Sequence, residues 1–74
     1  MADQGGADTR ARMLDLLLEK IIEDRYPSET MMDLIEELAE PDDLPAYAAV
    51  LMDKISDDMY PSYSMMRRVV NLTG

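Results

Sequence analysis

The sequence contains no cysteine and no histidine, and these two absences exclude much of the chemistry open to a small protein. Without cysteine there is no disulfide, no thiol nucleophile and no thiolate metal ligand. Without histidine the commonest general base is missing, and so is the commonest ligand for zinc and copper. The absence of cysteine also fits a reducing compartment. We therefore expect no cofactor and no metal centre with nitrogen or sulfur ligands.

Tryptophan and phenylalanine are also absent, and the three glycines all lie close to the ends of the chain. A glycine-rich loop that holds phosphate groups is therefore excluded from the interior of the sequence. The 47% of hydrophobic residues consists mainly of Leu, Ile, Val, Ala and eight Met. These side chains suit the packing of helix on helix, because Met fills irregular gaps. With 74 residues, the chain is long enough for one small domain.

Basic residues are scarce: seven Lys and Arg stand against sixteen Asp and Glu, which gives a formal charge of −9. Such a chain repels phosphate backbones and anionic lipids, so we expect neither nucleic acid nor a membrane as a partner. The longest apolar run, residues 46–52, is too short to cross a membrane. The first seven residues have neither the basic stretch nor the apolar run of a secretory signal. These features predict a cytoplasmic protein.

The strongest pattern in the sequence is an internal repeat of 34 residues. Residues 17–38 align without a gap with residues 51–72, and ten of these 22 positions are identical. Both copies contain Tyr-Pro-Ser, at residues 26–28 and 60–62, followed after two further residues by a Met-Met pair. In each copy, apolar residues at helical spacing lie on both sides of the proline. Each copy therefore predicts a helix, a turn at Tyr-Pro-Ser and a second helix.

The predicted fold class is all-α, a compact four-helix arrangement made of two duplicated helix–turn–helix hairpins. Residues 8–74 are expected to form a single helical domain, preceded by a flexible tail of residues 1–7. Hairpin one covers 8–39, a connector covers 40–43, and hairpin two covers 44–74. Because the links are short, sequential helices should be antiparallel neighbours.

Helical spacing also predicts which side chains are buried and which residues cap the helices. The expected buried positions are Met13, Leu14, Leu17, Leu18, Ile21, Met31, Leu34, Ile35, Leu38, Ala48, Leu51, Met52, Ile55, Met59, Met65, Val69 and Leu72. The expected helix caps are Asp8 or Thr9, Ser28 or Thr30, and Asp43.

The residue types argue against catalysis, and we expect no enzyme. The remaining reactive groups are carboxylates, hydroxyls and amines. A pair of carboxylates can act as acid and base only where a cleft raises the pKa of one of them. A bundle of this size has little room for such a cleft.

The apolar residues are more numerous than a single buried stripe requires, which predicts a surface for binding another protein. Adjacent residues on a helix point about 100° apart, so both members of a Met-Met pair cannot lie at the centre of one stripe. Met32 and Met66 should therefore lie at the stripe's edge, and Leu16 and Ile22 outside it. Met-rich surfaces adapt to partner helices. The candidate contacts are Met32, Met66, Leu16, Ile22, Tyr26 and Tyr60.

The leading prediction is thus a non-catalytic interaction module, a small adaptor or regulator that binds a basic or amphipathic helix of another protein, with a homodimer as a further candidate. A broad stripe can also serve only the chain's own packing, and the two tyrosines can simply cover the hairpin ends. An alternative is an acidic inhibitor that occupies the basic surface of a nucleic-acid-binding protein. Its surface would consist of Glu36, Glu37, Glu40, Asp42, Asp43, Asp57 and Asp58. A third reading is a divalent-metal site formed by carboxylates.

Overall fold

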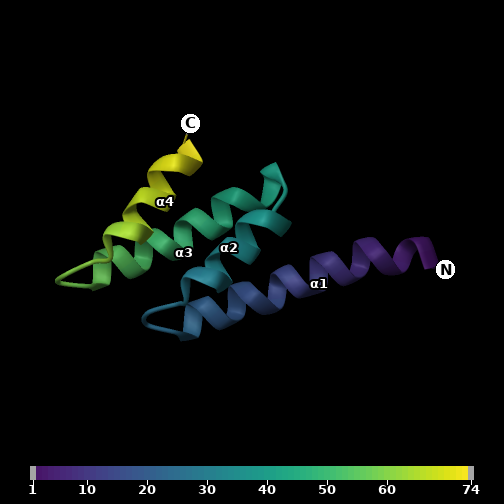
Figure 1. Cartoon of the computed structure of the whole chain (residues 1–74), viewed down its shortest axis with the longest axis horizontal. Coiled ribbons are helices and arrows are strands. Elements are labelled where there is room, and N and C mark those ends of the chain that lie inside the picture. The colour runs from purple at the N-terminus through teal and green to yellow at the C-terminus, as the bar shows by residue number, and fades with distance from the viewer. Residues whose placement is uncertain (1, 74) are drawn as a thin grey trace. The chain divides into compact units, whose positions relative to one another are not determined.

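A computed structural model describes the backbone of residues 2–73 and the side chains of residues 8–73. Regular structure in this part of the chain is helical throughout, which confirms the predicted all-α class (Figure 1). The elements in order are α1 (Ala2–Glu23), α2 (Glu29–Leu38), the 3₁₀ helix η1 (Pro41–Asp43), α3 (Leu44–Asp57) and α4 (Tyr63–Thr73). The chain divides into two compact units, unit 1 (Met1–Ala39) and unit 2 (Glu40–Gly74).

The first helix begins earlier than the sequence predicts. α1 starts at Ala2, so the expected start at a cap formed by Asp8 or Thr9 is wrong. Gly5 and Gly6 lie inside α1. Each glycine disfavours a helix by about 1 kcal/mol, but no proline follows to end it, and the helix continues into a strongly apolar segment. The mobility expected for residues 1–7 stays a prediction, and Met1 lies outside the described residues.

The Tyr-Pro-Ser segments separate the helices within each unit. Pro27 has no amide hydrogen and disfavours helical backbone at Tyr26, so α1 ends before them, at Glu23. Ser28 then caps α2: its Oγ accepts a hydrogen bond of 3.0 Å from the amide of Met31. Of the two caps considered for α2, Ser28 is therefore the one used.

The second Tyr-Pro-Ser segment has the same geometry. Ser62 Oγ accepts a hydrogen bond of 3.2 Å from the amide of Met65, in the first turn of α4. The carbonyl oxygen of Ser62 also accepts from the amide of Met66, at 3.1 Å, as the first bond of the helix. A serine side chain thus satisfies one of the amide groups that a helix start leaves without a partner.

The connector, residues 40–43 at the start of unit 2, contains a capping box. The carboxylate of Asp43 accepts a hydrogen bond of 3.0 Å from the amide of Glu40, which precedes η1. Asp43 precedes α3 as expected, but its side chain makes no cap bond to that helix. The sequence identified the position correctly, but the carboxylate accepts from the amide of Glu40, before η1, and not from an amide of α3. Pro45 is tolerated in the first turn of α3.

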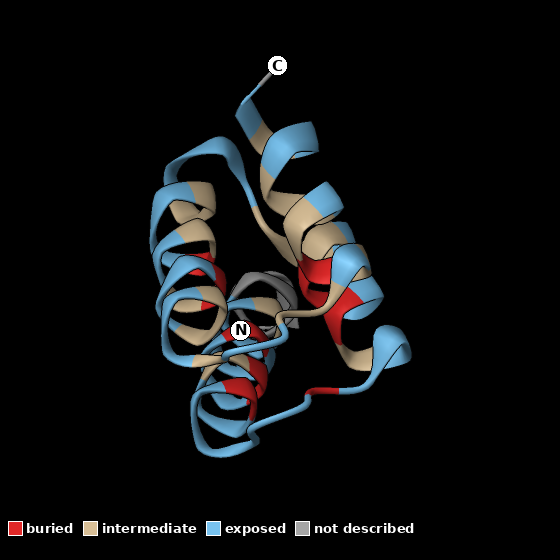
Figure 2. Ribbon diagram, turned by 90° about the vertical axis from the view of Figure 1, so that its left-hand side faces the viewer, coloured by how far each residue is buried: buried red, intermediate tan, exposed pale blue. Residues whose placement is uncertain are grey.

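In unit 1, α1 packs against α2. The side chains that are buried there lie at helical spacing on both helices, and Figure 2 shows the buried positions in red. They are Leu14, Leu17, Ile21, Met32 and Ile35. Met13 and Leu34, which were expected in the core, are exposed, since they lie at the margins of the stripes. The contact between the helices therefore buries a narrower stripe than the sequence pattern suggests.

In unit 2, α3 packs against α4 and also contacts η1. The buried side chains are Tyr47, Leu51 and Met65. Tyr47 is 0% exposed, although the sequence did not place it in the core. Met52 and Met59 were expected to be buried and are exposed. The buried face of α3 is therefore rotated toward Tyr47, whose ring fills more volume than the Met52 side chain would.

Candidate functional site

The two equivalent methionines of the repeat, both predicted as partner contacts, differ in burial. Met32 is 1% exposed and belongs to the core of the protein, so its assignment as an accessible contact is wrong. Met66 is half-buried. Its position at the stripe's edge leaves part of the side chain accessible. Periodicity alone places Met32 at the margin of its stripe, and the burial of a margin depends on packing that the helix's own sequence does not give.

The other predicted apolar contacts are exposed. Leu16 and Ile22 on α1 are 53% and 58% exposed, respectively. Three acids, Asp15, Glu19 and Glu23, are exposed on the same helix. Each of the other four residues is three or four positions from Glu19 along the chain, which puts all five on one side of α1. We call this set of Asp15, Leu16, Glu19, Ile22 and Glu23 the α1 outer face. It is apolar at two positions and acidic at three.

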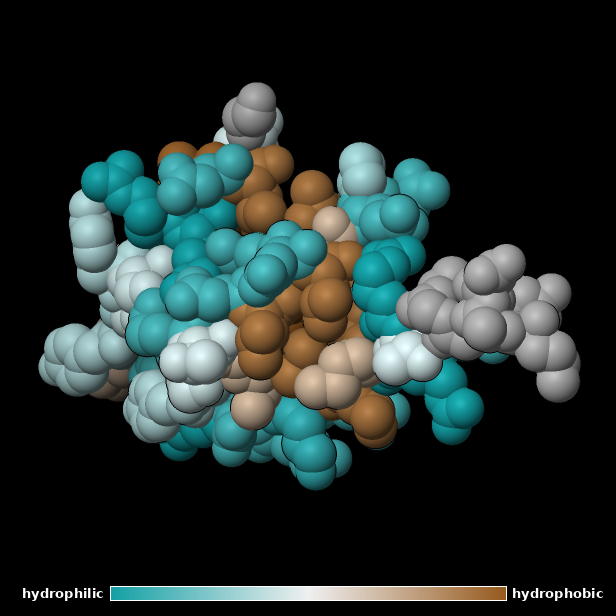
Figure 3. Space-filling view, turned by 45° about the vertical axis from the view of Figure 1, so that its right-hand side comes forward, coloured by the Kyte–Doolittle hydropathy of each residue, from teal (hydrophilic) through white to brown (hydrophobic). Residues whose placement is uncertain are grey.

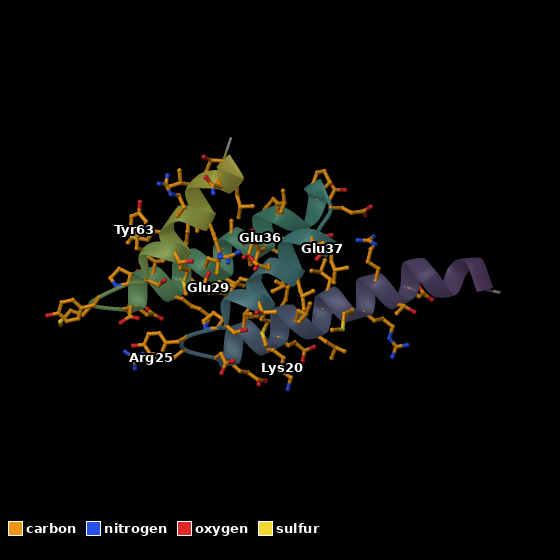
Figure 4. The ribbon with its side chains drawn as sticks, in the orientation of Figure 1. Lys20, Arg25, Glu29, Glu36, Glu37 and Tyr63 are labelled. Carbon is orange, nitrogen blue, oxygen red and sulfur yellow. The ribbon has the colours of Figure 1, made fainter. Side chains whose placement is uncertain are left out.

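The two tyrosines of the repeated turn are also exposed. Tyr26 and Tyr60 are 65% and 85% exposed. The guanidinium carbon of Arg25 lies 5.7 Å from the centre of the Tyr26 ring, within the range of a cation–π contact. Figure 4 shows Arg25 at the turn that follows α1, and Lys20 pointing away from α2. Both rings are thus accessible to another molecule, each at the end of its own unit.

Unit 2 exposes further large apolar residues that the sequence analysis missed as surface groups. Met59, Tyr63 and Val70 are all well exposed. On the face of the molecule drawn in Figure 3, apolar side chains reach the surface between hydrophilic ones. Tyr63 lies at the start of α4 with its side chain directed outward (Figure 4). Arg67 lies one turn later. A signal existed in the sequence: the positions 34 residues before Met59 and Tyr63 are polar, Arg25 and Glu29.

The acids of the alternative, inhibitory surface are divided between the two units of the chain. Glu36 and Glu37 lie on α2 in unit 1 and are labelled in Figure 4, whereas the others lie in unit 2, around η1 and at the end of α3. The exposed members are Glu37, Glu40, Asp42 and Asp57. The half-buried members are Glu36, Asp43 and Asp58.

Among the described residues, no group of three or more His, Cys, Asp or Glu side chains has the arrangement needed to hold a metal ion. We therefore do not propose the third reading, a carboxylate metal site. None of the helices described is both long and apolar enough to cross a membrane. The exposed residues offer apolar contact, carboxylates and aromatic rings, groups that occur in protein–protein interfaces.

The sequence matches no protein-family model, and no curated protein or solved structure is significantly similar to it. The residues themselves therefore carry the functional argument.

Proposed function

We propose that this chain is a non-catalytic protein–protein interaction module, a small cytoplasmic adaptor or regulator that binds a basic or amphipathic helix of another protein. The observation that supports this most strongly is the α1 outer face. It exposes Leu16 and Ile22 on a helix whose opposite side is already used in packing against α2. Exposed apolar side chains that share one side of a helix are candidates for a binding surface, and Leu16 and Ile22 lie on either side of Glu19, three residues from it.

The charges of the α1 outer face define the kind of helix that fits it. Leu16 and Ile22 lie at the two edges of this face, and the carboxylates of Asp15, Glu19 and Glu23 lie between them. A partner helix with an apolar stripe and flanking Lys or Arg would bury the apolar surface and place its cations beside these carboxylates. Tyr26 extends the same unit with an exposed ring, a residue type enriched among binding hot spots.

We further propose that the two units are copies of one hairpin, joined by the connector. Support comes from boundaries that repeat at an interval of 34 residues: α1 and α3 end at Glu23 and Asp57, and α2 and α4 begin at Glu29 and Tyr63. The serine caps have the same spacing. A duplicated hairpin can keep one fold in both copies while its exposed residues diverge, which suits an adaptor with two different surfaces.

The acidic inhibitor remains an alternative because four of its acids are exposed. It differs from the leading proposal in how binding responds to salt. An acidic inhibitor binds because its carboxylates take the place of phosphate groups on a basic surface. This long-range attraction is strongly screened as the salt concentration rises. Docking of an apolar face is much less sensitive to salt.

Affinity capture from the source organism's extract tests the proposal, with the wild type beside a Leu16→Asp/Ile22→Asp variant. Both residues are exposed, so the variant should keep the wild-type circular dichroism spectrum. A matched control, Ala46→Asp/Ala49→Asp, adds the same charge at two exposed positions on α3. The expected result is one protein retained by the wild type and by the control, lost from the variant, and stable to a moderate-salt wash.

Two outcomes would contradict the proposal. Equal retention of every protein by the wild type and the variant would exclude the α1 outer face. A protein that both retain, and that moderate salt removes, would instead favour the acidic inhibitor. Substituting Glu40 and Asp42, both exposed, with Asn or Gln would then be expected to weaken its retention.

A further inference from the structure

The end of the chain has a surface whose charge is opposite to that of the rest. Residues 59–74 contain two arginines and no acid, so all sixteen acids precede residue 59. Five exposed residues in this segment form what we call the α4 surface: Met59, Tyr60, Tyr63, Arg67 and Val70. The last three have the spacing i, i+4, i+7 and lie on one side of α4, and the first two lie in the turn before it.

The turn itself does not require these apolar residues. Unit 1 contains the same turn, with the same serine cap, but has Arg25 and Glu29 where unit 2 has Met59 and Tyr63. Polar side chains are therefore compatible with this local backbone. Exposing Met59 and Tyr63 instead leaves apolar surface in water, where it gains nothing for folding. A binding partner that covers Met59 and Tyr63 would remove this apolar surface from water.

Arg67 is held in a defined position on the α4 surface. Its Nη2 donates a hydrogen bond of 3.2 Å to the hydroxyl oxygen of Tyr63, and its guanidinium carbon lies 5.7 Å from the centre of that ring. A guanidinium has five N–H groups, so further donors remain for a carboxylate. An ordered arginine beside an exposed aromatic ring loses less conformational freedom on binding than a mobile one.

The α4 surface and the α1 outer face are complementary. One presents an arginine with aromatic and aliphatic side chains, and no acid lies in its segment. The other presents Leu16 and Ile22 among three carboxylates. The α1 outer face is one side of a helix, and the α4 surface is one side of α4 together with the turn before it. The α4 surface has the properties proposed above for a partner of the α1 outer face, because it is an amphipathic helix that carries positive charge.

We propose that the α4 surface of one copy of this chain binds the α1 outer face of a second copy. This inference rests on the proposed function, because it uses the same α1 face and identifies its partner helix. Two different surfaces meet in such a contact, so it is heterologous: each bound copy still offers one unused surface, and chains or rings form as the concentration rises. Two single-helix faces bury a small area, so the association is weak and reversible.

Sedimentation velocity and light scattering measure this association directly. The average mass of the wild type should rise between about 10 µM and about 1 mM, the range in which small interfaces associate. An α4 variant, Arg67→Glu/Val70→Ser, changes the charge by two and should remain a monomer. The matched control, Ala46→Glu/Ala49→Glu, adds the same negative charge outside both surfaces and should associate like the wild type.

A mixing experiment separates this contact from a symmetric one. The α1 variant, Leu16→Ser/Glu19→Arg/Ile22→Ser, should also remain a monomer, while its α4 surface is intact. The α4 variant keeps an intact α1 outer face. An equimolar mixture of the two variants should form a heterodimer and nothing larger, because each copy then has one functional surface. Circular dichroism confirms that all variants remain folded.

Three results would overturn the inference. They are a wild type that is monomeric over the whole concentration range, an α4 variant that still associates, and a mixture of the two variants that stays monomeric. None of these results refutes the proposed function. The capture experiment tests the α1 outer face against another protein, by asking whether the Leu16→Asp/Ile22→Asp variant loses a protein that the wild type retains. A fourth result, self-association that persists in the α1 variant, would contradict the use of the α1 outer face in this contact.

Discussion

The side chain of Arg10 is joined to the backbone of Leu38: Nη1 of the arginine donates a hydrogen bond of 2.7 Å to the carbonyl oxygen. Leu38 is the last residue of α2, where carbonyl groups lack partners within the helix. A cation at this end also interacts favourably with the helix dipole. The bond joins α1 to α2 through two residues that are 28 positions apart in sequence.

Replacing Arg10 with Met should therefore lower the stability of the fold. The expected loss is about 1–2 kcal/mol of unfolding free energy, because the bond is partly buried and its donor is charged. Urea denaturation followed by circular dichroism measures it. Arg12→Met is the control, since Arg12 is exposed on the same helix, and it should change stability little. Equal effects of the two substitutions would show that the bond to Leu38 contributes nothing specific.

Replacing either serine cap should destabilise its own helix start. Ser28→Ala and Ser62→Ala are each expected to cost about 1 kcal/mol, since each removes the acceptor for one amide of the first turn. Thermal denaturation should show a lower midpoint, by roughly 4–8 °C per kcal/mol for a domain of this size. Ser56→Ala, at an exposed position on α3, should leave the midpoint unchanged. A cap variant as stable as the wild type would mean that water replaces the bond.

The equivalent methionines of the repeat should respond differently to truncation. Met32→Ala removes a side chain that is almost completely buried and should cost about 2–5 kcal/mol, or abolish cooperative unfolding altogether. Met66→Ala should cost less, because the Met66 side chain is only half-buried. Chemical denaturation of both variants gives the comparison. A larger loss for Met66→Ala would contradict the burial described for α2 and α4.

The apolar residues of the second turn should be dispensable for folding. Met59→Ser and Tyr60→Ser should each change the unfolding free energy by no more than about 0.5 kcal/mol, because both side chains lie largely in water. Tyr47→Ala, at a completely buried position, should cost about 3 kcal/mol or more. The same denaturation measurement distinguishes them. A large loss for Met59→Ser or Tyr60→Ser would show that the turn contributes to the core.

The candidate site could be predicted only in part. Leu16, Ile22, Tyr26 and Tyr60 were selected from the sequence and are exposed, as a binding surface requires. Met32 was selected by the same reasoning and is buried. The two outcomes differ because periodicity gives the direction of a side chain around its own helix, while the neighbouring helix decides how wide a stripe is covered.

Local chemistry made the helices and the boundaries at the Tyr-Pro-Ser turns predictable from the sequence by itself, but not the start of α1. Apolar spacing predicted the all-α class, and Pro27 with Ser28 marked the end of one helix and the start of the next, because backbone restriction and capping act between neighbouring residues. Only the tertiary structure decided that Tyr47 is buried while Met59 is exposed. Burial depends on which helix faces pack together, and that contact joins residues far apart in the chain.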